Sequence, residues 1–286
     1  MKKGDINVIS LGGIKGTYCI GDIHGRFDSI NNFIRKNDIC DSLIIICGDC
    51  GFGFENIEYY QKKVFPSLKR NLTKYKDTII FIRGNHDDPS YYNNSLFNFK
   101  RIKTIPDYTV LNVFSDKGKT VLVHSILCIG GATSIDRLYR ININNRNIVE
   151  KMLLSGCNKD EAIKTAKRTY WDDEAPAYNE DFLKRIDRKR CPIDIVCSHT
   201  APSFCMPRTT EGLESFMKYD KFLSKDLYEE RKVFDYVYSY LRNNNFMIKR
   251  WCYGHFHRHY NEVIDDTCFV LLDMYKDGKL DFEYIE

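Results

Sequence analysis

The stretch Thr17-Tyr18-Cys19-Ile20-Gly21-Asp22-Ile23-His24-Gly25 places a short apolar run directly before an aspartate and a histidine. A run of β-branched, aromatic and apolar residues that stops at a glycine is typical of a buried strand. Three further stretches repeat this arrangement, and they are Leu43–Asp49, Thr78–Asp87 and Ile193–His199. Because buried parallel strands are apolar along their whole length, these stretches predict the parallel strands of an α/β fold.

The segments between the first three strands are long enough to hold helices. The spacing from Asp22 to Asp49, and from Asp49 to Asn85, is close to the roughly 30 residues of a strand–helix–strand unit. Apolar residues at helical spacing predict helices over residues 28–35 and 55–75. Open α/β sheets place their sites at the carboxyl ends of the strands, so the polar residues there are candidates for a site.

Those strand ends, together with Gly254-His255-Phe256-His257, supply seven side chains that bind metals well. They are Asp22, His24, Asp49, Asn85, His199, His255 and His257. Carboxylate and amide oxygens with imidazole nitrogens suit Mn²⁺, Fe or Zn²⁺ and differ from the thiolates of a structural zinc site. Two ions can share one carboxylate, and Asp49 is the candidate for this role because it follows the middle strand.

The order of these motifs resembles the calcineurin-like metallophosphoesterases, whose pattern is G-D-x-H, G-D, G-N-H-[DE], a lone His and G-H-x-H. The resemblance extends from residue 21 to residue 257. It implies two divalent ions, with Mn²⁺ as the first choice and Fe or Zn²⁺ as alternatives. The ligand sets it implies are Asp22, His24, Asp49 and His257 for one ion, and Asp49, Asn85, His199 and His255 for the other.

The same resemblance implies a hydrolase of phosphate monoesters or diesters, in which a hydroxide held by both ions attacks phosphorus. His86 remains outside the ligand sets, and we expect it to protonate the leaving oxygen. A nuclease or a cyclic-nucleotide phosphodiesterase with the same metals is the alternative. A non-catalytic metal-binding scaffold is disfavoured because His86 is present.

One departure separates the chain from the protein serine/threonine phosphatases. Those proteins carry G-D-x-x-D-R-G, with an Asp that orients the catalytic histidine and an Arg that binds phosphate. Here Phe52 and Gly53 occupy these two positions. The sequence therefore resembles a bacterial-type member of the family, and the group that orients His86 is open. Asp87 is a candidate for that role, or it only shapes the turn.

The segment Gly130–Arg140 offers another source of positive charge near the site. It resembles a Gly-Gly-Ala-x-Ser-x-Asp segment in bacterial members of the family, and it contains Arg137 and Arg140. A Gly-Gly turn after a strand could bring either guanidinium to a phosphate, where it binds two oxygens at once. Surface arginines in a strand-to-loop turn are the alternative reading. Arg26, at the start of the first helix, is a further candidate.

The fold class expected from the family is a four-layer αββα sandwich of two mixed β-sheets flanked by helices. Apolar runs at residue 102 and over 109–131, 248–253, 268–272 and 280–284 predict a second sheet. We treat residues 1–286 as a single domain, with helical insertions at about 141–190 and 206–242 that shape the substrate pocket. Within these insertions, helices are expected over 158–168 and 178–188.

Composition sets few limits on the substrate. The net charge of +4 leaves a phosphorylated small molecule, a nucleotide or a nucleic acid as candidate partners, and the oligomeric state is open. No apolar run reaches about 18 residues, so we expect no membrane span. The eleven cysteines and the lack of a secretory signal predict reduced, mostly buried thiols in a cytoplasmic protein.

Overall fold

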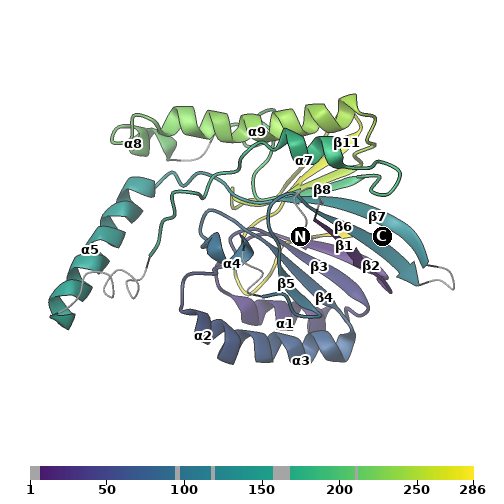
Figure 1. The fold of residues 1–286 in the computed structure, drawn as a ribbon, viewed down its shortest axis with the longest axis horizontal. Helices are drawn as coiled ribbons and strands as arrows, with labels where there is room; N and C mark the ends of the chain where they lie inside the picture. The colour runs from purple at the N-terminus through teal and green to yellow at the C-terminus, as the bar shows by residue number, and fades with distance from the viewer. Residues whose placement is uncertain (1–6, 94–96, 117–119, 157–167, 210–211) are drawn as a thin grey trace.

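Two β-sheets, of seven and five strands, lie face to face, and helices cover both outer surfaces (Figure 1). The computed structural model describes residues 7–93, 97–116, 120–156, 168–209 and 212–286. Both sheets contain parallel and antiparallel neighbours. The predicted fold class, two mixed sheets between layers of helices, is therefore confirmed.

The five-stranded sheet has the order β12-β2-β3-β4-β5. Its strands are β2 (Gly16–Ile20), β3 (Ser42–Cys47), β4 (Thr78–Ile82), β5 (Ile102–Thr104) and β12 (Phe282–Ile285). The first four are parallel, and β12 runs antiparallel beside β2. Every residue of β3 and β4 is buried, which explains their unbroken apolar sequences. The apolar runs at residue 102 and over 280–284 were predicted to lie in a different sheet from β2, β3 and β4. That prediction is wrong, because β5 and β12 belong to the same five-stranded sheet as these strands.

The seven-stranded sheet has the order β1-β6-β7-β8-β9-β11-β10. Its strands are β1 (Val8–Leu11), β6 (Thr109–Asp116), β7 (Thr120–Ile129), β8 (Ile195–Ser198), β9 (Arg250–Tyr253), β10 (Tyr260–Ile264) and β11 (Thr267–Leu271). The two edge strands, β1 and β10, have no counterpart among the predicted strands. β10 is exposed and partly polar, so it lacks the apolar run that identifies a buried strand, whereas β1 carries a short, half-exposed apolar run that was not recognised.

One layer of helices covers the five-stranded sheet. It contains α1 (Phe27–Lys36) and a long helical segment made of α2 (Ile57–Tyr59), the π-helical turn η1 (Tyr60–Val64) and α3 (Phe65–Tyr75). The apolar faces of α1 and α3 pack on the outer side of β3 and β4 through residues such as Ile30, Phe33 and Leu68. The two predicted helices over 28–35 and 55–75 are both present. A short helix, α4 (Ser90–Asn93), follows β4.

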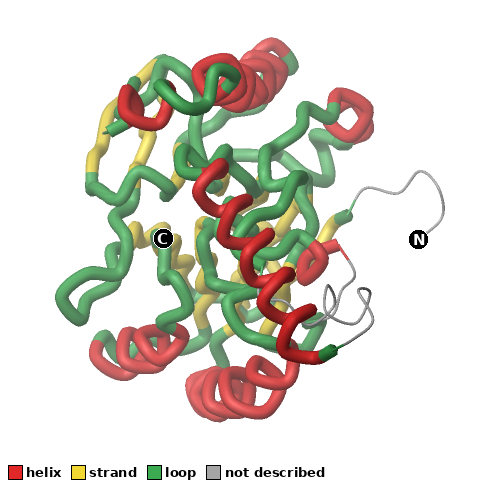
Figure 2. Tube along the Cα trace, turned by 90° about the vertical axis from the view of Figure 1, so that its left-hand side faces the viewer, coloured by secondary structure: helices red, strands yellow, loops and turns green. Residues whose placement is uncertain are grey.

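The opposite layer covers the seven-stranded sheet. It is formed by α7 (Glu180–Arg185) and α9 (Leu223–Asn243), with the short α8 (Leu213–Met217) before α9. Phe182 of α7 and Phe234 of α9 are buried against Trp251 of β9. Figure 2, viewed from the side, shows helices above and below with the strands between them.

A third helical element projects from the body of the protein. Helix α5 (Arg137–Ser155) extends sideways from the layers (Figure 1), and Asn144 is its only buried residue. The expectation of a strand-to-loop turn through Arg140 is therefore wrong, because Arg137 and Arg140 lie in the first turns of this helix. The helix predicted over 158–168 falls almost wholly outside the described residues. The helix predicted over 178–188 corresponds to α7.

The space between the two sheets is filled by apolar side chains and thiols. Leu43, Ile45, Ile80, Ile126 and Ile195 are fully or almost fully buried there. All ten described cysteines are free, and eight of them are buried, which agrees with the expectation of reduced, mostly buried thiols. Among the described residues, no helix has the length and apolar character needed to cross a membrane.

Asp77 is an unusual buried carboxylate at the start of β4. Its Oδ1 atom accepts a hydrogen bond of 3.0 Å from the Ser42 amide, and its Oδ2 atom has no partner among the described residues. Burial raises the pKa of Asp77 to about 7. The native protein therefore keeps a proton that the unfolded chain releases near pH 4, so stability falls as the pH rises from about 4 to 7.

We predict that Asp77→Asn stabilises the protein by about 1–3 kcal/mol at pH 8 and changes little at pH 4, because the amide still accepts from Ser42 but cannot ionise. Urea unfolding at both pH values measures this difference. Asp41→Asn is the control, because a hydrogen bond from Lys15 lowers the pKa of Asp41. A gain for Asp77→Asn that is equal at both pH values contradicts the ionisation argument.

Candidate metal centre

The strand ends bring the predicted first ligand set together. Asp22 and His24 follow β2, Asp49 follows β3, and His257 follows β9; one donor atom from each lies within 4.8 Å of all the others. The Nε2 atoms of His24 and His257 are 3.1 Å apart. Asp22 Oδ2 lies 3.3 Å from His257 Nε2. Four donors from two sheets therefore converge on one point.

The predicted second set lies directly beside the first. His199 Nε2 is 3.0 Å from Asn85 Oδ1 and 3.3 Å from Asp49 Oδ1. The ring of His255 lies 5.1 Å from that of His199. Asp49 Oδ2 faces the other way, 3.9 Å from His24 Nε2. The Asp49 carboxylate thus presents one oxygen to each set, as a ligand shared by two ions must do.

Burial and mutual charge dominate the electrostatics of this centre. The Asp22 and Asp49 side chains are at most 1% exposed. Although burial opposes its ionisation, the imidazoles of His86 and His199 hold the pKa of Asp49 well below its usual value. Burial alone would lower the pKa of His199, but Asp49 raises it to about 10. The Asp49 carboxylate is therefore held as an anion although its side chain is almost fully buried, which favours a bound cation.

The backbone is strained where the ligands lie. His24, Asp49, His255 and His257 all have positive φ, between 42° and 72°. Such conformations cost of order 1–3 kcal/mol each and persist only where the surroundings enforce them. Gly48 contributes to this enforcement, because a Cβ atom there would collide with the His199 ring. The two sheets can thus approach closely enough to share a ligand set.

Asp87 holds two of the ligand loops together. Its buried carboxylate accepts four backbone N–H bonds of 2.7–3.0 Å, and the donors are Cys50, Gly51, Phe52 and Gly84. No bond joins Asp87 to the His86 side chain among the described contacts. The geometry therefore favours the turn-shaping role over the orientation of His86.

His86 lies at the edge of the ligand sets and meets an arginine. Its Nε2 atom is 3.8 Å from Asp49 Oδ2 and accepts a 2.6 Å hydrogen bond from Arg140 Nη2. Burial lowers the pKa of His86 to about 4, and the nearby Arg140 adds to this effect. Phe52 is fully buried among aromatic rings, so position 52 supplies no group to His86. Arg140 is the side chain that contacts the ring instead.

The two candidate arginines differ in their surroundings. Arg140 reaches the site because its Nε atom bonds to Asp136, which directs the guanidinium toward His86. Arg137 forms ion pairs of 2.5 Å with Asp220 and 2.7 Å with Asp226, and it joins α5 to the start of α9. The structure thus brings Arg140 to the ligand sets and places Arg137 in a contact between helices.

Two functional residues were missed by sequence reasoning. Ser134 Oγ accepts a 2.9 Å hydrogen bond from Asn85 Nδ2 and donates a 2.7 Å bond to Glu174 Oε2. Burial raises the pKa of Glu174 to about 8, against the effect of its bonds from Ser134. These bonds fix the Asn85 amide so that its oxygen faces the second set. The serine of the Gly-Gly-Ala-Thr-Ser segment was a signal in the sequence, whereas Glu174 reaches it from a segment 40 residues further along the chain.

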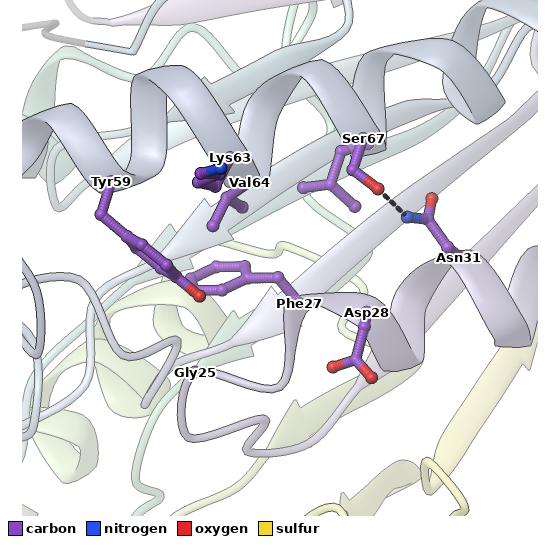
Figure 3. Close-up of a pocket in the computed structure, with 9 residues that line it drawn as sticks. Gly25, Phe27, Asp28, Asn31, Tyr59, Lys63, Val64 and Ser67 are labelled. Atoms are coloured by element: carbon purple, nitrogen blue, oxygen red, sulfur yellow. Dashed lines mark hydrogen bonds between the residues drawn. The ribbon is translucent and has the colours of Figure 1, made fainter.

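A pocket of about 410 Å³ opens above the two sets. Besides the ligands Asp49, Asn85, His255 and His257, its lining includes His86, Asp136, Arg140, Thr209, Phe256 and Arg258. A smaller crevice of about 230 Å³ lies between α1 and η1, where Tyr59, Lys63 and Asn31 surround it (Figure 3). None of the predicted ligands lines that crevice, so the chemistry belongs to the larger pocket.

Four other polar side chains, among them the candidate Arg26, do not line the pocket. Arg26 is exposed at the start of α1. His124 bonds to Asp194, and His259 bonds to Asp281, each through Nδ1. Cys50 is fully buried and donates to the Ile82 carbonyl, which agrees with a packing role.

A comparison with protein families identifies the same motifs. The family model for calcineurin-like phosphoesterases matches residues 17–259. The chain belongs to this family. Members of the family use a dinuclear centre of divalent ions to hydrolyse phosphate esters, so this protein is a phosphoesterase with a candidate Asp/His centre. The oxygen and imidazole donors of both sets fit such ions.

Solved structures also resemble this calcineurin-like phosphoesterase. A dimetal phosphatase from Danio rerio is 12% identical, with a TM-score of 0.50, and the match covers 95% of this chain and 92% of that one. A phosphopantetheinyl hydrolase from Mycobacterium tuberculosis is 14% identical, with a TM-score of 0.37 and coverage of 91% and 89%. At such identities, the first of these likenesses shows the fold alone.

We predict that Ser134→Ala weakens the binding of the second ion by roughly 10–100-fold and leaves the first nearly unchanged, because the Asn85 amide loses its support. Glu174→Gln should act in the same direction. Competition with a chelator, monitored for Mn²⁺, measures both affinities.

Ser125→Ala is the matched control for this prediction. Ser125 is also a buried serine bonded to an asparagine, Asn112, but it lies in β7 away from the ligands. If Ser134→Ala and Ser125→Ala weaken metal binding equally, the loss reflects general destabilisation and the support of Asn85 is not the cause.

Proposed function

We propose that this calcineurin-like phosphoesterase hydrolyses phosphate monoesters or diesters with two divalent ions, for which Mn²⁺ is the first candidate. The position of the Asp49 carboxylate carries the proposal, because its two oxygens face two separate donor sets. Asp22, His24, Asp49 and His257 would hold one ion, and Asp49, Asn85, His199 and His255 the other. Such ions lower the pKa of a bound water toward about 7 and neutralise phosphoryl oxygens.

The residues of the chain then divide the remaining work. His86 protonates the leaving oxygen, since it lies at the edge of both sets and inside the pocket. Arg140 binds a phosphoryl oxygen that the ions do not reach, with a guanidinium that can contact two oxygens. Asp87 keeps the loops of Asp49 and Asn85 in register through its four backbone bonds.

The bond between Arg140 and His86 connects these two roles. When Nε2 of His86 accepts from Arg140, the ring is neutral and that nitrogen carries no proton. A phosphate that attracts Arg140 frees Nε2, which can then take up a proton and face the leaving oxygen. In this proposal, His86 Nε2 takes up its proton only after a bound phosphate has drawn Arg140 away from it.

The insertion at about 206–242 forms part of the pocket in this proposal, and the insertion at about 141–190 begins at its edge. Arg140 stands directly before the first insertion, and Pro207 and Thr209 from the second one line the same space. The cavity volume of about 410 Å³ suits a phosphorylated small molecule or a nucleotide.

We predict that His86→Ala keeps both ions and loses roughly 10²–10⁴-fold in kcat on esters with poor leaving groups, because protonation of the leaving oxygen is lost. Nitrophenyl phosphates need less protonation and should be affected less. Steady-state assays of the Mn²⁺-loaded enzyme on alkyl and nitrophenyl esters measure both losses. His259→Ala, which removes an exposed histidine outside the pocket, is the control. Equal losses on both classes of ester would exclude His86 as the general acid.

We predict that Arg140→Ala lowers kcat/KM for monoesters by at least about tenfold, or 1.4 kcal/mol, and lowers it less for diesters, which carry one charge fewer. Arg146→Ala is the matched control, because Arg146 is exposed on the same helix. Paired assays on an alkyl phosphate monoester and the matching diester measure the difference. No change for Arg140→Ala on either ester would remove the proposed phosphate contact.

A further inference from the structure

Four cysteines meet between the two sheets, below the candidate metal centre. Cys19 lies on β2 and Cys47 on β3, both in the five-stranded sheet, whereas Cys197 lies on β8 and Cys252 on β9 in the seven-stranded sheet. All four are completely buried. Two thiols from each sheet thus share one enclosed space, which we name the thiol cluster.

Three of these thiols have the spacing of ligands to a single ion. The Sγ atoms of Cys19 and Cys197 are 3.4 Å apart, and those of Cys19, Cys47 and Cys197 all lie within 4.8 Å of one another. Cys252 interacts with the thiols of both Cys19 and Cys197. In a tetrahedral site with Zn–S bonds of about 2.3 Å, neighbouring sulfurs are about 3.8 Å apart.

Other buried thiols in this protein are satisfied differently. Cys50 donates to the Ile82 carbonyl, and Cys191 lies 3.6 Å from the Asn112 amide nitrogen. In the thiol cluster, the one bond found among the described residues joins Cys19 to Cys197. The four sulfurs therefore face one another, with apolar neighbours such as Ile80 and Val270 around them.

The strand periodicity explains this convergence. Side chains two positions apart in a strand point to the same face. Cys47 precedes Asp49 by two positions, and Cys197 precedes His199 by two. Cys47 thus ends the strand that leads to Asp49, Cys197 lies in the strand that leads to His199, and Cys197 and Cys252 are register partners on neighbouring parallel strands. The close packing of the five-stranded sheet on the seven-stranded sheet therefore also brings the thiols of the two sheets close together.

We propose that the thiol cluster is a closed structural site for one Zn²⁺ ion, separate from the two ions of the proposed function. Cys19, Cys47 and Cys197 lie within 4.8 Å of one another, and Cys252 beside two of them completes a set of four thiolate ligands for zinc once its sulfur moves onto the ion. On binding, each thiol releases its proton to solvent and donates a sulfur electron pair to the ion, with no redox change. The site is fully enclosed, so the ion enters as the chain folds and binding contributes to folding.

The negative charge of a zinc site with four thiolates would be offset by the two divalent ions of the proposed function. Four thiolates and one Zn²⁺ carry two net negative charges, which are costly to bury alone. In the proposed function, two divalent ions lie one layer above and supply positive charge. The third ion therefore strengthens the contact between the sheets on which the upper ligands depend.

Metal analysis and optical spectroscopy of the full chain test this proposal. Asp49→Asn should lose the two upper ions and keep one Zn²⁺ per chain, because it leaves all four thiols intact. Loading the same variant with Co²⁺ should produce the near-ultraviolet thiolate-to-cobalt absorption, which carboxylate and imidazole ligands cannot give. Cys197→Ser should lose this absorption, and Cys205→Ser, which alters a buried thiol outside the thiol cluster, should keep it.

The outcomes separate this site from the proposed function. A wild-type protein that binds two ions but shows no thiolate absorption overturns the thiol cluster as a metal site and leaves the function standing. Thiolate absorption with one ion per chain in the wild type supports the site and contradicts the dinuclear function. If Cys197→Ser fails to fold, the Asp49→Asn measurement decides alone. A Cys19–Cys197 disulfide found by mass spectrometry in the purified native protein also overturns the proposal.

Discussion

The buried carboxylate of Asp87 is the constraint on which the site depends. It receives four backbone N–H groups from the loops that follow β3 and β4, so neither loop can move without exposing an unpaired charge. Those loops carry Asp49 and Asn85, whose oxygens must face the same small space. Burial and Asp49 raise the pKa of Asp87, while its N–H donors oppose that rise. A residue that touches no substrate thereby fixes the spacing of the centre.

Buried hydrogen bonds also connect the segment after α5 to the end of β4. Arg83, which directly precedes the Gly84-Asn85 pair, donates to the backbone carbonyls of Asp173, Glu174 and Ala175. Glu174 in turn holds Ser134, which orients the Asn85 amide. The chain after α5 therefore returns to the sheet at a defined point, although α5 itself projects outward. Catalytic geometry and pocket shape are thus set by one set of hydrogen bonds.

The sequence predicted the parallel strands well, because apolar runs are local signals, and the residues of both predicted ligand sets lie close together, while their binding of metal stays a prediction. The roles of Arg137 and Arg140 could not be separated, since the difference lies in distant partners, Asp220 for one and His86 for the other. Glu174 was missed for the same reason. The edge strand β10 was missed because an exposed strand need not be apolar, whereas β1 carries a short apolar run that was not recognised. A contact between segments that are distant in the sequence cannot be predicted from the local pattern of residues in either segment.

The antiparallel pairing of β12 with β2 has a consequence for the order of folding. β2 leads to Asp22, and the Gly21 amide bonds to the Asp281 carbonyl just before β12. During synthesis the β2 edge stays open until residues 282–285 have left the ribosome, and such remote pairings form slowly. The first metal ligand in the chain thus receives its support late. An incomplete nascent chain therefore lacks this support for the β2 edge and for Asp22 at its end.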